Sequence, residues 1–295
     1  MTQRYLFDRL EFYITNVCNL TCSGCNRYNN YRFSGWWSWA DAQPVLEQWA
    51  KKIDIRHPVI LGGEPLLNPD IVKWIAGLHR LWPDHSGVQV QSNGTRIDCV
   101  RGLYDVIDGS NWIGISIHNP DDRDEIFARI RNFLVHPIEE TADKNHPIGS
   151  DYQFVDANKK YVHCWMSNRF VQSNIIEIDG RHTLYRSDPD RAHENCTFRR
   201  FKNYHMIRGK IYKCGPVALM PEFDHQYRFD ITDEERRIMH SYPALSVEEY
   251  DDRGAEFLAH IDDVIPQCRF CPEHYDYRPI TFSGIKKPWK KEPKD

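Results

Sequence analysis

Seven of the nine cysteines in this sequence of 295 residues fall into two groups whose spacings suit metal binding. Structural disulfides are rare in reducing compartments, so grouped cysteines in a chain without secretory features indicate metal or redox chemistry. The N-terminal cysteine group is Cys18, Cys22 and Cys25. The C-terminal cysteine group is Cys196, Cys214, Cys268 and Cys271. The two groups are candidates for two metal centres.

The N-terminal cysteine group has the spacing C-x3-C-x2-C and directly follows residues 12–15, an apolar run that predicts a short strand. Three thiolates on one loop can hold three irons of a [4Fe–4S] cluster, which leaves the fourth iron open. An open position is what a reactive metal centre needs, whereas structural sites are closed. Zinc is the weaker alternative, because zinc ribbons normally bring paired C-x2-C knuckles.

The C-terminal cysteine group has the spacing C-x17-C followed later by C-x2-C. Four thiolates satisfy a closed tetrahedral zinc site and a second [4Fe–4S] cluster equally well. A cluster held by four cysteines has no open iron, so it would transfer electrons or brace a domain with little core.

Alternating strands and helices must position these cysteines. Apolar runs predict strands at residues 58–61, 88–91, 112–117 and 161–165, and helical periodicity predicts helices at residues 38–53, 70–81, 97–107 and 121–134. Strands that alternate with helices form βαβ units around a parallel sheet. Residues 135–160 show no clear period, which predicts a long connection. Hairpins are expected to turn at Asp179-Gly180 and Arg208-Gly209.

The surroundings of the N-terminal cysteine group resemble the radical S-adenosylmethionine (SAM) superfamily. The resemblance rests on ITNVCNLTCSGC (residues 14–25), GGEP (residues 62–65) and QSNGT (residues 91–95). It implies an α/β fold with a partial (β/α)6 TIM-type barrel, in which sites gather at the C-terminal ends of the strands. It also implies that the N-terminal cysteine group holds a [4Fe–4S] cluster whose open iron is chelated by S-adenosylmethionine.

The resemblance further implies a set of cofactor-binding residues: Gly62, Gly63, Glu64, Pro65, Ser92, Asn93, Ser116 and His118. Glu64 would receive the amino group of the cofactor, since a carboxylate suits an ammonium group. For Ser116 and His118, ordinary polar residues at the barrel rim are an equal alternative. Where the family usually has an aromatic residue before the third cysteine, this sequence has Gly24. Tyr28, Trp36, Trp37 and Trp39 are therefore candidates either to cover the cofactor or to pack.

The C-terminal cysteine group resembles the shortened auxiliary-cluster domain, called twitch and related to SPASM domains, that follows the barrel in some of these enzymes. On this analogy we favour a second [4Fe–4S] cluster over zinc. The predicted organisation is a radical SAM barrel at residues 1–186, a small α+β twitch-like domain at residues 187–278, and a charged tail at residues 279–295.

These assignments predict an enzyme that forms a 5′-deoxyadenosyl radical and abstracts a hydrogen atom. A closed second cluster favours oxidation, by dehydrogenation, of a small hydroxylated or sugar-like substrate. A radical epimerase is one alternative, in which Cys164 of a barrel strand faces the cavity and returns a hydrogen atom. A peptide-modifying maturase ranks lower, because we see no additional N-terminal leader-binding domain. The non-enzymatic alternative is a zinc-stabilised binding module.

Composition and charge limit the partners. Lys and Arg number 38 against 42 Asp and Glu, a net charge of −4, whereas nucleic-acid-binding proteins usually carry a basic excess. No apolar run approaches the ~18 residues of a membrane span, and charged residues interrupt the N-terminal apolar residues. We expect a cytoplasmic protein with a small-molecule substrate, no membrane or nucleic-acid partner, and an external electron donor such as flavodoxin or ferredoxin.

Overall fold

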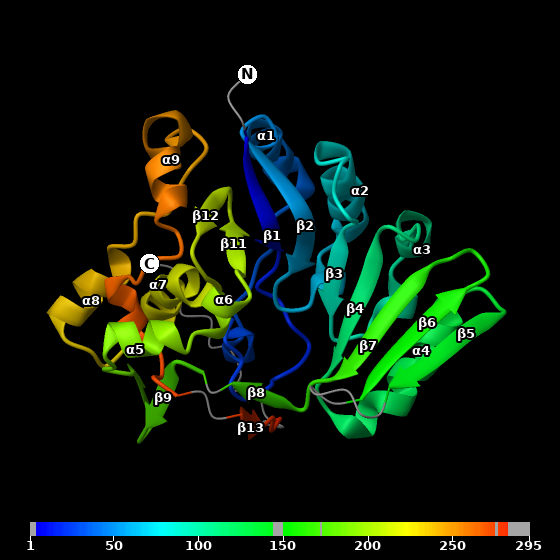
Figure 1. Cartoon of the computed structure of the whole chain (residues 1–295). Coiled ribbons are helices and arrows are strands. Elements are labelled where there is room, and N and C mark those ends of the chain that lie inside the picture. The colour runs from blue at the N-terminus through cyan, green and yellow to red at the C-terminus, as the bar shows by residue number, and fades with distance from the viewer. Residues whose placement is uncertain (1–3, 144–149, 172, 275–276, 283–295) are drawn as a thin grey trace, which may run out of the picture.

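The computed structural model describes residues 4–143, 150–171, 173–274 and 277–282 (Figure 1). Residues 283–295 of the predicted charged tail lie outside the described residues. A nine-stranded sheet organises the chain in the order β12-β11-β1-β2-β3-β4-β7-β6-β5. Its strands are β1 (Tyr5–Tyr13), β2 (Ile53–Leu61), β3 (Gln89–Ser92), β4 (Trp112–Ile117), β5 (Ile138–Asp143), β6 (Asp151–Asp156), β7 (Tyr161–Met166), β11 (Tyr204–Ile207) and β12 (Lys210–Tyr212).

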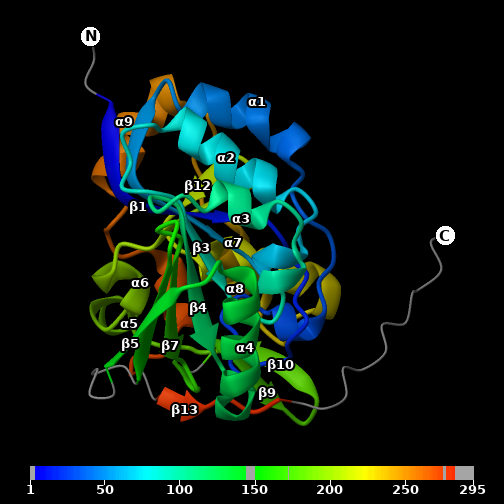
Figure 2. The ribbon, with the colours of Figure 1, turned by 90° about the vertical axis from the view of Figure 1, so that its right-hand side faces the viewer.

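The centre of the sheet is parallel and follows the predicted alternation. Neighbouring strands run parallel from β11 through β1, β2, β3 and β4 to β7. Four helices follow the first strands and cover one face of the sheet (Figure 2): α1 (Trp39–Trp49), α2 (Ile71–Leu81), α3 (Leu103–Val106) and α4 (Arg123–Phe133). The predicted α/β fold with a mostly parallel sheet is confirmed. The sheet itself is open, with β12 and β5 at its edges.

Helix α1 shows how local sequence and packing agree. Ser38 caps its start, accepting a hydrogen bond from the Asp41 backbone N–H, and so satisfies one of the first unpaired donors. Leu46 and Trp49 recur at helical spacing and are fully buried. The Trp49 indole N–H donates to the Gly209 carbonyl oxygen at 2.9 Å, which ties this early helix to the turn between β11 and β12.

The prediction of a long connection over residues 135–160 is wrong. Strands β5 and β6 form an antiparallel pair there, and β6 continues the sheet beside β7. All but the first residue of β5 are exposed, so this edge strand carries no apolar period that the sequence could reveal. Polar edge strands are a common protection against unwanted strand pairing.

The C-terminal part of the chain shares the sheet with the N-terminal part. Strand β11 pairs in parallel with β1, with Leu10 opposite Tyr204 and Tyr13 opposite Ile207. A second apolar cluster joins Tyr13 and Leu61 of the first strands to Phe223 and Ile207. The predicted boundary at residues 186 and 187 therefore does not separate two cores.

The remaining elements of the C-terminal part lie beside β11 and β12 (Figure 1). They are α5 (Pro189–Glu194), α6 (Thr197–Arg200), α7 (Gly215–Tyr227), α8 (Asp233–His240) and α9 (Tyr250–Ala259). Two small two-stranded sheets complete the fold: β9 (Ile175–Ile178) with β10 (Arg181–Leu184), and β8 (Arg169–Val171) with β13 (Tyr277–Pro279). Within the ranges that the structure describes, no helix has the length and apolarity to span a membrane.

A fragment that ends at residue 186 tests this shared core. It lacks β11, so the buried strand β1 becomes an edge strand and the Tyr13 cluster loses its cover. We expect the fragment to aggregate or to lose cooperative urea unfolding, measured beside the full chain by size exclusion and circular dichroism. A soluble, cooperatively unfolding fragment would instead support two independent domains.

Candidate functional site

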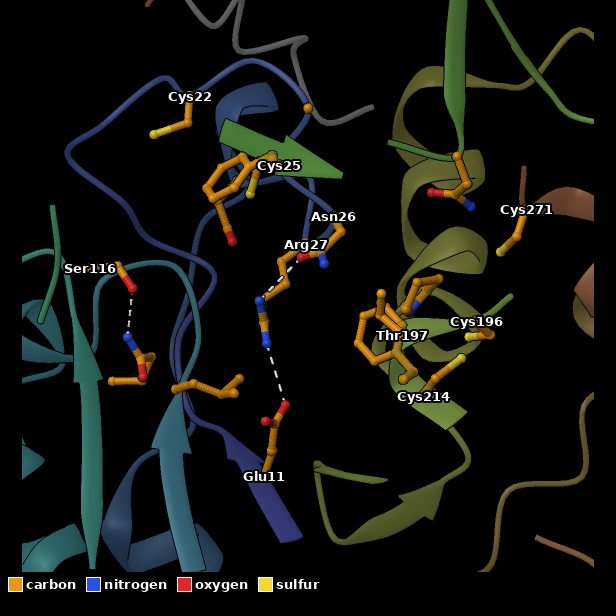
Figure 3. Close-up of a pocket in the computed structure, with 18 of the residues that line it drawn as sticks. Glu11, Cys22, Cys25, Asn26, Arg27, Ser116, Cys196, Thr197, Cys214 and Cys271 are labelled. Atoms are coloured by element: carbon orange, nitrogen blue, oxygen red, sulfur yellow. Dashed lines mark hydrogen bonds and ion pairs between the residues drawn. The ribbon is translucent and has the colours of Figure 1, made fainter. Parts of the chain in front are cut away.

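A cavity of ≈ 430 Å³ lies on the face of the sheet that α1–α4 do not cover (Figure 3). Its walls come from strand side chains such as Glu11 and Ser116 and, opposite them, from residues of the C-terminal part such as Thr197. This volume lies within the range of small-molecule sites, roughly 300–1,000 Å³. All seven cysteines of the two groups line it.

The two cysteine groups approach the cavity from different elements. In Figure 3, Cys22 and Cys25 lie on one side of the cavity and Cys196, Cys214 and Cys271 on the other. The two sequence groups therefore lie on different sides of one cavity.

The loop of the N-terminal cysteine group suits thiolate ligands. It follows β1, and Gly24 adopts φ 73°, a left-handed conformation that favours glycine. The Leu20 backbone N–H points at the Cys18 sulfur, with 3.4 Å between nitrogen and sulfur. Donors of this kind stabilise a charged sulfur. Three cysteines on one loop beside a cavity fit the three-thiolate holder of a [4Fe–4S] cluster.

Gly62 and Gly63 press the end of β2 against the start of the cysteine loop. The Gly63 N–H donates to the Thr15 carbonyl oxygen at 2.8 Å, and the Glu64 N–H donates to the Val17 carbonyl oxygen at 2.8 Å. A Cβ on Gly63 would lie 2.2 Å from the Val17 oxygen. Both glycines also line the cavity, so they serve close packing of two loops at its wall.

The side chain of Glu64 does not line the cavity. It is 0% exposed and accepts hydrogen bonds from the Leu66 N–H, the Ser92 hydroxyl and the Asn93 N–H. Burial raises the pKa of Glu64, and these hydrogen bonds act in the opposite direction. In this structure Glu64 joins the loops after β2 and β3, and its role toward the amino group of a cofactor stays a prediction. Pro65 is buried beside it.

Ser92, Asn93, Ser116 and His118 all line the cavity, as predicted from their positions at strand ends. The Asn93 amide donates to Asn19 of the cysteine loop at 2.9 Å. His118 Nδ1 lies 3.1 Å from the Ser167 carbonyl oxygen. Because a carbonyl only accepts, Nδ1 carries the ring hydrogen and Nε2 carries the lone pair.

Three of the four aromatic candidates near the cysteine loop pack against other side chains. Tyr28 is fully buried, and the rings of Trp37 and Trp39 contact that of Trp74, the first tilted and the second edge-to-face. Trp36 is 54% exposed. None of these four candidates is among the described residues that line the cavity.

The C-terminal cysteine group is collected from three separate segments. Cys196 precedes α6, Cys214 precedes α7, and Cys268 and Cys271 lie in and just after a short 3₁₀ segment. Burial raises the pKa of Cys271 well above its ordinary value, and the other three thiols of the group act in the same direction. The four sulfurs therefore influence one another electrostatically.

The surroundings of this group favour thiolates once a positive centre is bound. Cys214 lies at the start of α7, where the helix dipole favours negative charge. Lys213 lies close to Cys214 and Cys268, and burial lowers its pKa. Among the described residues, no three or more His, Cys, Asp or Glu side chains are arranged around a position for a single metal ion.

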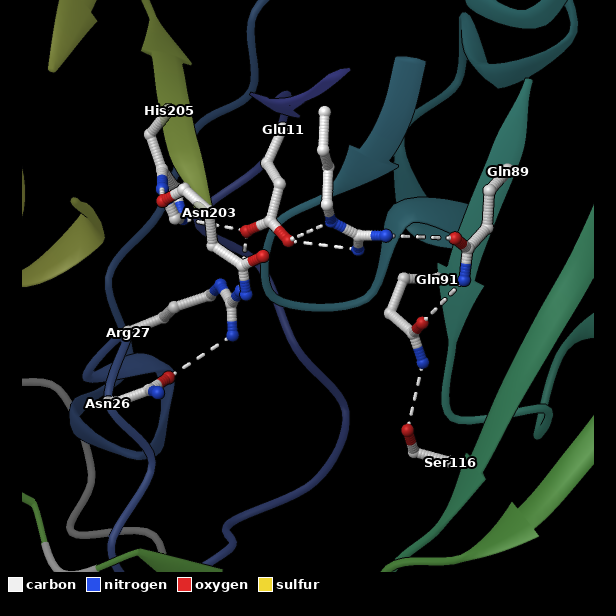
Figure 4. A network of polar contacts seen from close by, with 9 residues as sticks. Glu11, Asn26, Arg27, Gln89, Gln91, Ser116, Asn203 and His205 are labelled. Carbon is white, nitrogen blue, oxygen red and sulfur yellow. Dashed lines mark hydrogen bonds and ion pairs between the residues drawn. The ribbon is translucent and has the colours of Figure 1, made fainter. Parts of the chain in front are cut away.

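A buried carboxylate forms the floor of the cavity (Figure 4). Glu11 is 2% exposed and accepts from Arg9 Nε at 3.0 Å and from Arg27 Nη2 at 3.3 Å. His205 Nε2 lies 3.1 Å from the Glu11 carboxylate. Burial alone would raise the pKa of Glu11, but the positive charges of Arg9 and Arg27, together with that of His205 when it is protonated, have the larger opposite effect, so the net shift is downward. Glu11 therefore remains ionised in the interior.

Polar side chains continue from this carboxylate across the sheet (Figure 4). Arg9 donates to Gln89 at 3.3 Å, Gln89 donates to Gln91 at 3.1 Å, and Gln91 donates to the Ser116 hydroxyl at 2.8 Å. The interior of a TIM-type barrel is normally filled by branched apolar side chains. Here the cavity face offers amide, hydroxyl and guanidinium groups, which suits a polar ligand.

The prediction that Cys164 faces the cavity is wrong. Cys164 is 0% exposed and packs in the apolar core with Ile115 and Phe154. It pairs with Ile115 in the β4–β7 register, so both side chains lie on the helix-covered face, while the neighbouring Trp165 lines the cavity. The other ungrouped cysteine, Cys99, is exposed.

The chain after Cys271 returns to the N-terminal cysteine loop. The Ser23 N–H donates to the Thr281 carbonyl oxygen at 2.9 Å, and the Thr281 N–H donates to the Ser23 hydroxyl at 2.8 Å. Strand β13 pairs with β8, whose Arg169 and Phe170 line the cavity. This return connects the segments of the two cysteine groups.

Comparison with known proteins agrees with the N-terminal site. Residues 12–144 match the model of the radical SAM superfamily. This stretch is therefore a radical SAM superfamily domain. Similarity to this superfamily implies S-adenosylmethionine and one [4Fe–4S] cluster as cofactors, and 5′-deoxyadenosyl radical chemistry as the activity. No curated protein matches the chain.

Three of the solved structures that are similar to this chain are those of BtrN, SuiB and anSMEcpe. BtrN in complex with AdoMet and 2-DOIA is 13% identical, with 89% of each chain covered and a TM-score of 0.48. SuiB from Streptococcus suis bound to S-adenosylmethionine is 20% identical, covering 40% of this chain and 27% of that one, with a TM-score of 0.32. The structure of anSMEcpe with bound AdoMet and Cp18Cys peptide is 16% identical, covering 44% and 40%, with a TM-score of 0.33. Likeness at this level carries no functional assignment.

Replacing Gly63 tests the packing of the two loops. In Gly63→Ala the new methyl group meets the Val17 carbonyl, so we expect a loss of about 1–3 kcal/mol of unfolding free energy, the usual cost of overpacking. Iron bound per chain should fall as well, because the cysteine loop is displaced. Gly180→Ala is the control, since nothing lies within 4 Å of its Cβ and only its φ of 75° is strained. Equal stability and equal iron in the two variants would refute this role.

The pH dependence of stability tests the buried network. Burial lowers the pKa of His205 from 6.5 to about 4, against the opposing effect of Glu11. The unfolded chain therefore binds a proton at His205 before the folded chain does, and stability falls as pH drops from about 6.5 to 4. We expect the unfolding free energy of His205→Gln to decrease less over this pH range, by up to about 3 kcal/mol, because one pKa unit corresponds to ~1.4 kcal/mol. The control is His260→Gln at an exposed position; equal pH slopes in both variants would contradict the assignment.

Proposed function

We propose that this protein is a radical SAM oxidoreductase that dehydrogenates a small hydroxylated substrate held in the cavity. One observation supports the proposal above all: the thiols of both cysteine groups line the same cavity, with a polar floor between them. A substrate in this cavity lies within reach of both centres. The open sheet would correspond to the partial barrel, and the C-terminal part to the twitch-like unit.

Two centres together can remove the hydrogen atom and the electron that a dehydrogenation takes from its substrate. The cluster at the N-terminal cysteine group, with S-adenosylmethionine, supplies a 5′-deoxyadenosyl radical. Dehydrogenation of a secondary alcohol removes one hydrogen atom from carbon, one electron and one hydroxyl proton. A cluster at the C-terminal cysteine group would accept the electron, and an external donor such as flavodoxin or ferredoxin in the cytoplasm would supply the electron for the first step.

His118 is suited to accept the hydroxyl proton. Its Nδ1 donates to the Ser167 carbonyl, so Nε2 presents a lone pair. Burial lowers the pKa of His118, and the imidazole is therefore neutral near pH 7. A neutral imidazole that lines the cavity can take a proton, as a general base must.

The polar floor would orient the hydroxyl groups of the substrate. Ser116 and Gln91 can donate and accept, Arg27 donates, and the Glu11 carboxylate accepts. Gly62, Gly63, Ser92 and Asn93 lie at the cavity wall near the N-terminal cysteine group and would flank S-adenosylmethionine. These roles match a sugar-like substrate better than an apolar one.

The alternatives have less support. An epimerase that uses Cys164 as hydrogen donor does not fit, because that thiol lies in the core on the other face of the sheet. A peptide substrate remains compatible with the cavity but has no observation in its favour. A zinc-stabilised module would leave the cysteine loop of the radical SAM domain without its function.

Paired cysteine variants test the proposal. Anaerobically reconstituted protein should bind about eight irons per chain, four per cluster. Cys25→Ala should lose about four irons and all dithionite-dependent formation of 5′-deoxyadenosine. Cys271→Ala should also lose about four irons but should still form 5′-deoxyadenosine, because its thiol belongs to the other site.

Cys99→Ala is the matched control, since this exposed thiol lies outside both groups. Iron and S-adenosylmethionine cleavage should stay at wild-type levels. About four irons and one zinc in the wild type would remove the electron acceptor and overturn the oxidative step. Wild-type cleavage in Cys25→Ala would overturn the assignment of the first site.

A further inference from the structure

Two buried side chains between the cysteine groups have no part in the proposed reaction. Tyr28 follows Cys25 by three residues and is 0% exposed. Its hydroxyl donates a hydrogen bond to Asn174 Oδ1 at 2.6 Å. Asn174 is 4% exposed and lines the cavity. The pair joins the N-terminal cysteine loop to the segment before β9.

The Tyr28 hydroxyl lies within electrostatic reach of both cysteine groups. Burial raises the pKa of Tyr28 well above its ordinary value, and the thiols of Cys271, Cys214 and Cys25 act in the same direction, with Cys271 the strongest of the three. The hydroxyl therefore stays protonated and acts as a donor. Because the Tyr28 hydroxyl donates to Oδ1, the Nδ2 end of the Asn174 amide faces away from Tyr28.

The other end of the Asn174 amide is unpaired. Nδ2 is buried and has no hydrogen-bond partner among the described residues. A buried amide donor left unpaired is destabilising. Such a donor at the wall of a cavity indicates an acceptor that belongs in the cavity. Asn174 lines the same cavity as the C-terminal cysteine group, and two thiols of that group, Cys271 and Cys214, have the largest thiol effects on the pKa of its partner Tyr28.

We propose that Asn174 Nδ2 donates a hydrogen bond to a sulfur of the cluster held by the C-terminal cysteine group, and that Tyr28 is the positioning residue that orients the amide. This inference rests on the proposed function. Hydrogen bonds to cluster sulfurs help set the reduction potential. Because a donor stabilises the more negative, reduced cluster, it raises the potential. Asn174 thus makes the C-terminal cluster a better acceptor for the substrate electron.

A redox titration of the reconstituted full-length protein followed by EPR tests the proposal. Asn174→Leu keeps the side-chain volume and removes the donor. At the potential where the wild-type C-terminal cluster is half reduced, its ratio of oxidised to reduced cluster should rise at least about threefold; a tenfold rise corresponds to about 59 mV for one electron. Tyr28→Phe keeps the packed ring and should shift the ratio in the same direction by less.

Asn158→Leu is the control, because Asn158 also bonds a tyrosine hydroxyl, that of Tyr104 at 2.8 Å, but at an exposed position. Its potential should equal that of the wild type. If Asn174→Leu loses the second cluster, Asn174→Asp serves instead, since it keeps the acceptor for Tyr28 and replaces the donor with a negative charge. Two iron–sulfur clusters with unchanged potential in these variants would refute this inference alone. Zinc at the C-terminal site would refute it together with the oxidative function.

Discussion

The buried carboxylate of Glu11 is the interaction on which the arrangement of this protein depends. It lies on β1 and contacts Arg27 of the cysteine loop and His205 of β11. Three segments that are distant in sequence therefore meet at one charge. Removing one partner of such a buried group commonly costs ~3–5 kcal/mol, because the remaining charge is left uncompensated. The network thus fixes how the cysteine loop faces the C-terminal part.

This constraint explains why the cavity is polar and shared. Alternation along β1 sends Leu10 and Phe12 toward the helices, and Arg9 and Glu11 toward the cavity. One face of the sheet consequently forms an apolar core, while the other holds a hydrogen-bonded polar layer. The C-terminal part covers that polar layer, and its cysteines complete the wall of the cavity. The two cysteine groups line opposite sides of the cavity, because β11 and β12 attach the C-terminal part to the sheet whose strand β1 leads into the cysteine loop.

Local patterns in the sequence predicted the elements that depend on local chemistry. The hairpins turn where expected, with positive φ at Asp179, Gly180, Arg208 and Gly209. The cysteine spacing predicts two groups, and the structure places both of them at the wall of one cavity. Pairing between distant strands is not encoded in local periodicity, so the parallel contact of β11 with β1 was missed. The polar strand β5 was missed for lack of an apolar period.

The alternation of side chains along a strand defines two faces, but it does not show which face packs in the core. In β7 the less polar set includes Val162 and Cys164, and the other set includes His163 and Trp165. If the cavity face is polar, Cys164 belongs to the core, and the charged residues Arg9 and Glu11 on one alternating face of β1 are the sequence signal for that polarity. The GGEP motif was located correctly, but the sequence could not show that Glu64 turns inward to bond the loop after β3.

The most direct test of the central claim, two iron–sulfur clusters facing one cavity, is the EPR spectrum of the fully reduced protein. Two nearby paramagnetic clusters interact magnetically. We predict that the wild-type spectrum differs from the sum of the spectra of Cys25→Ala and Cys271→Ala, through broadening or splitting of both signals. A wild-type spectrum equal to that sum, or one identical to the spectrum of Cys271→Ala, would contradict the account.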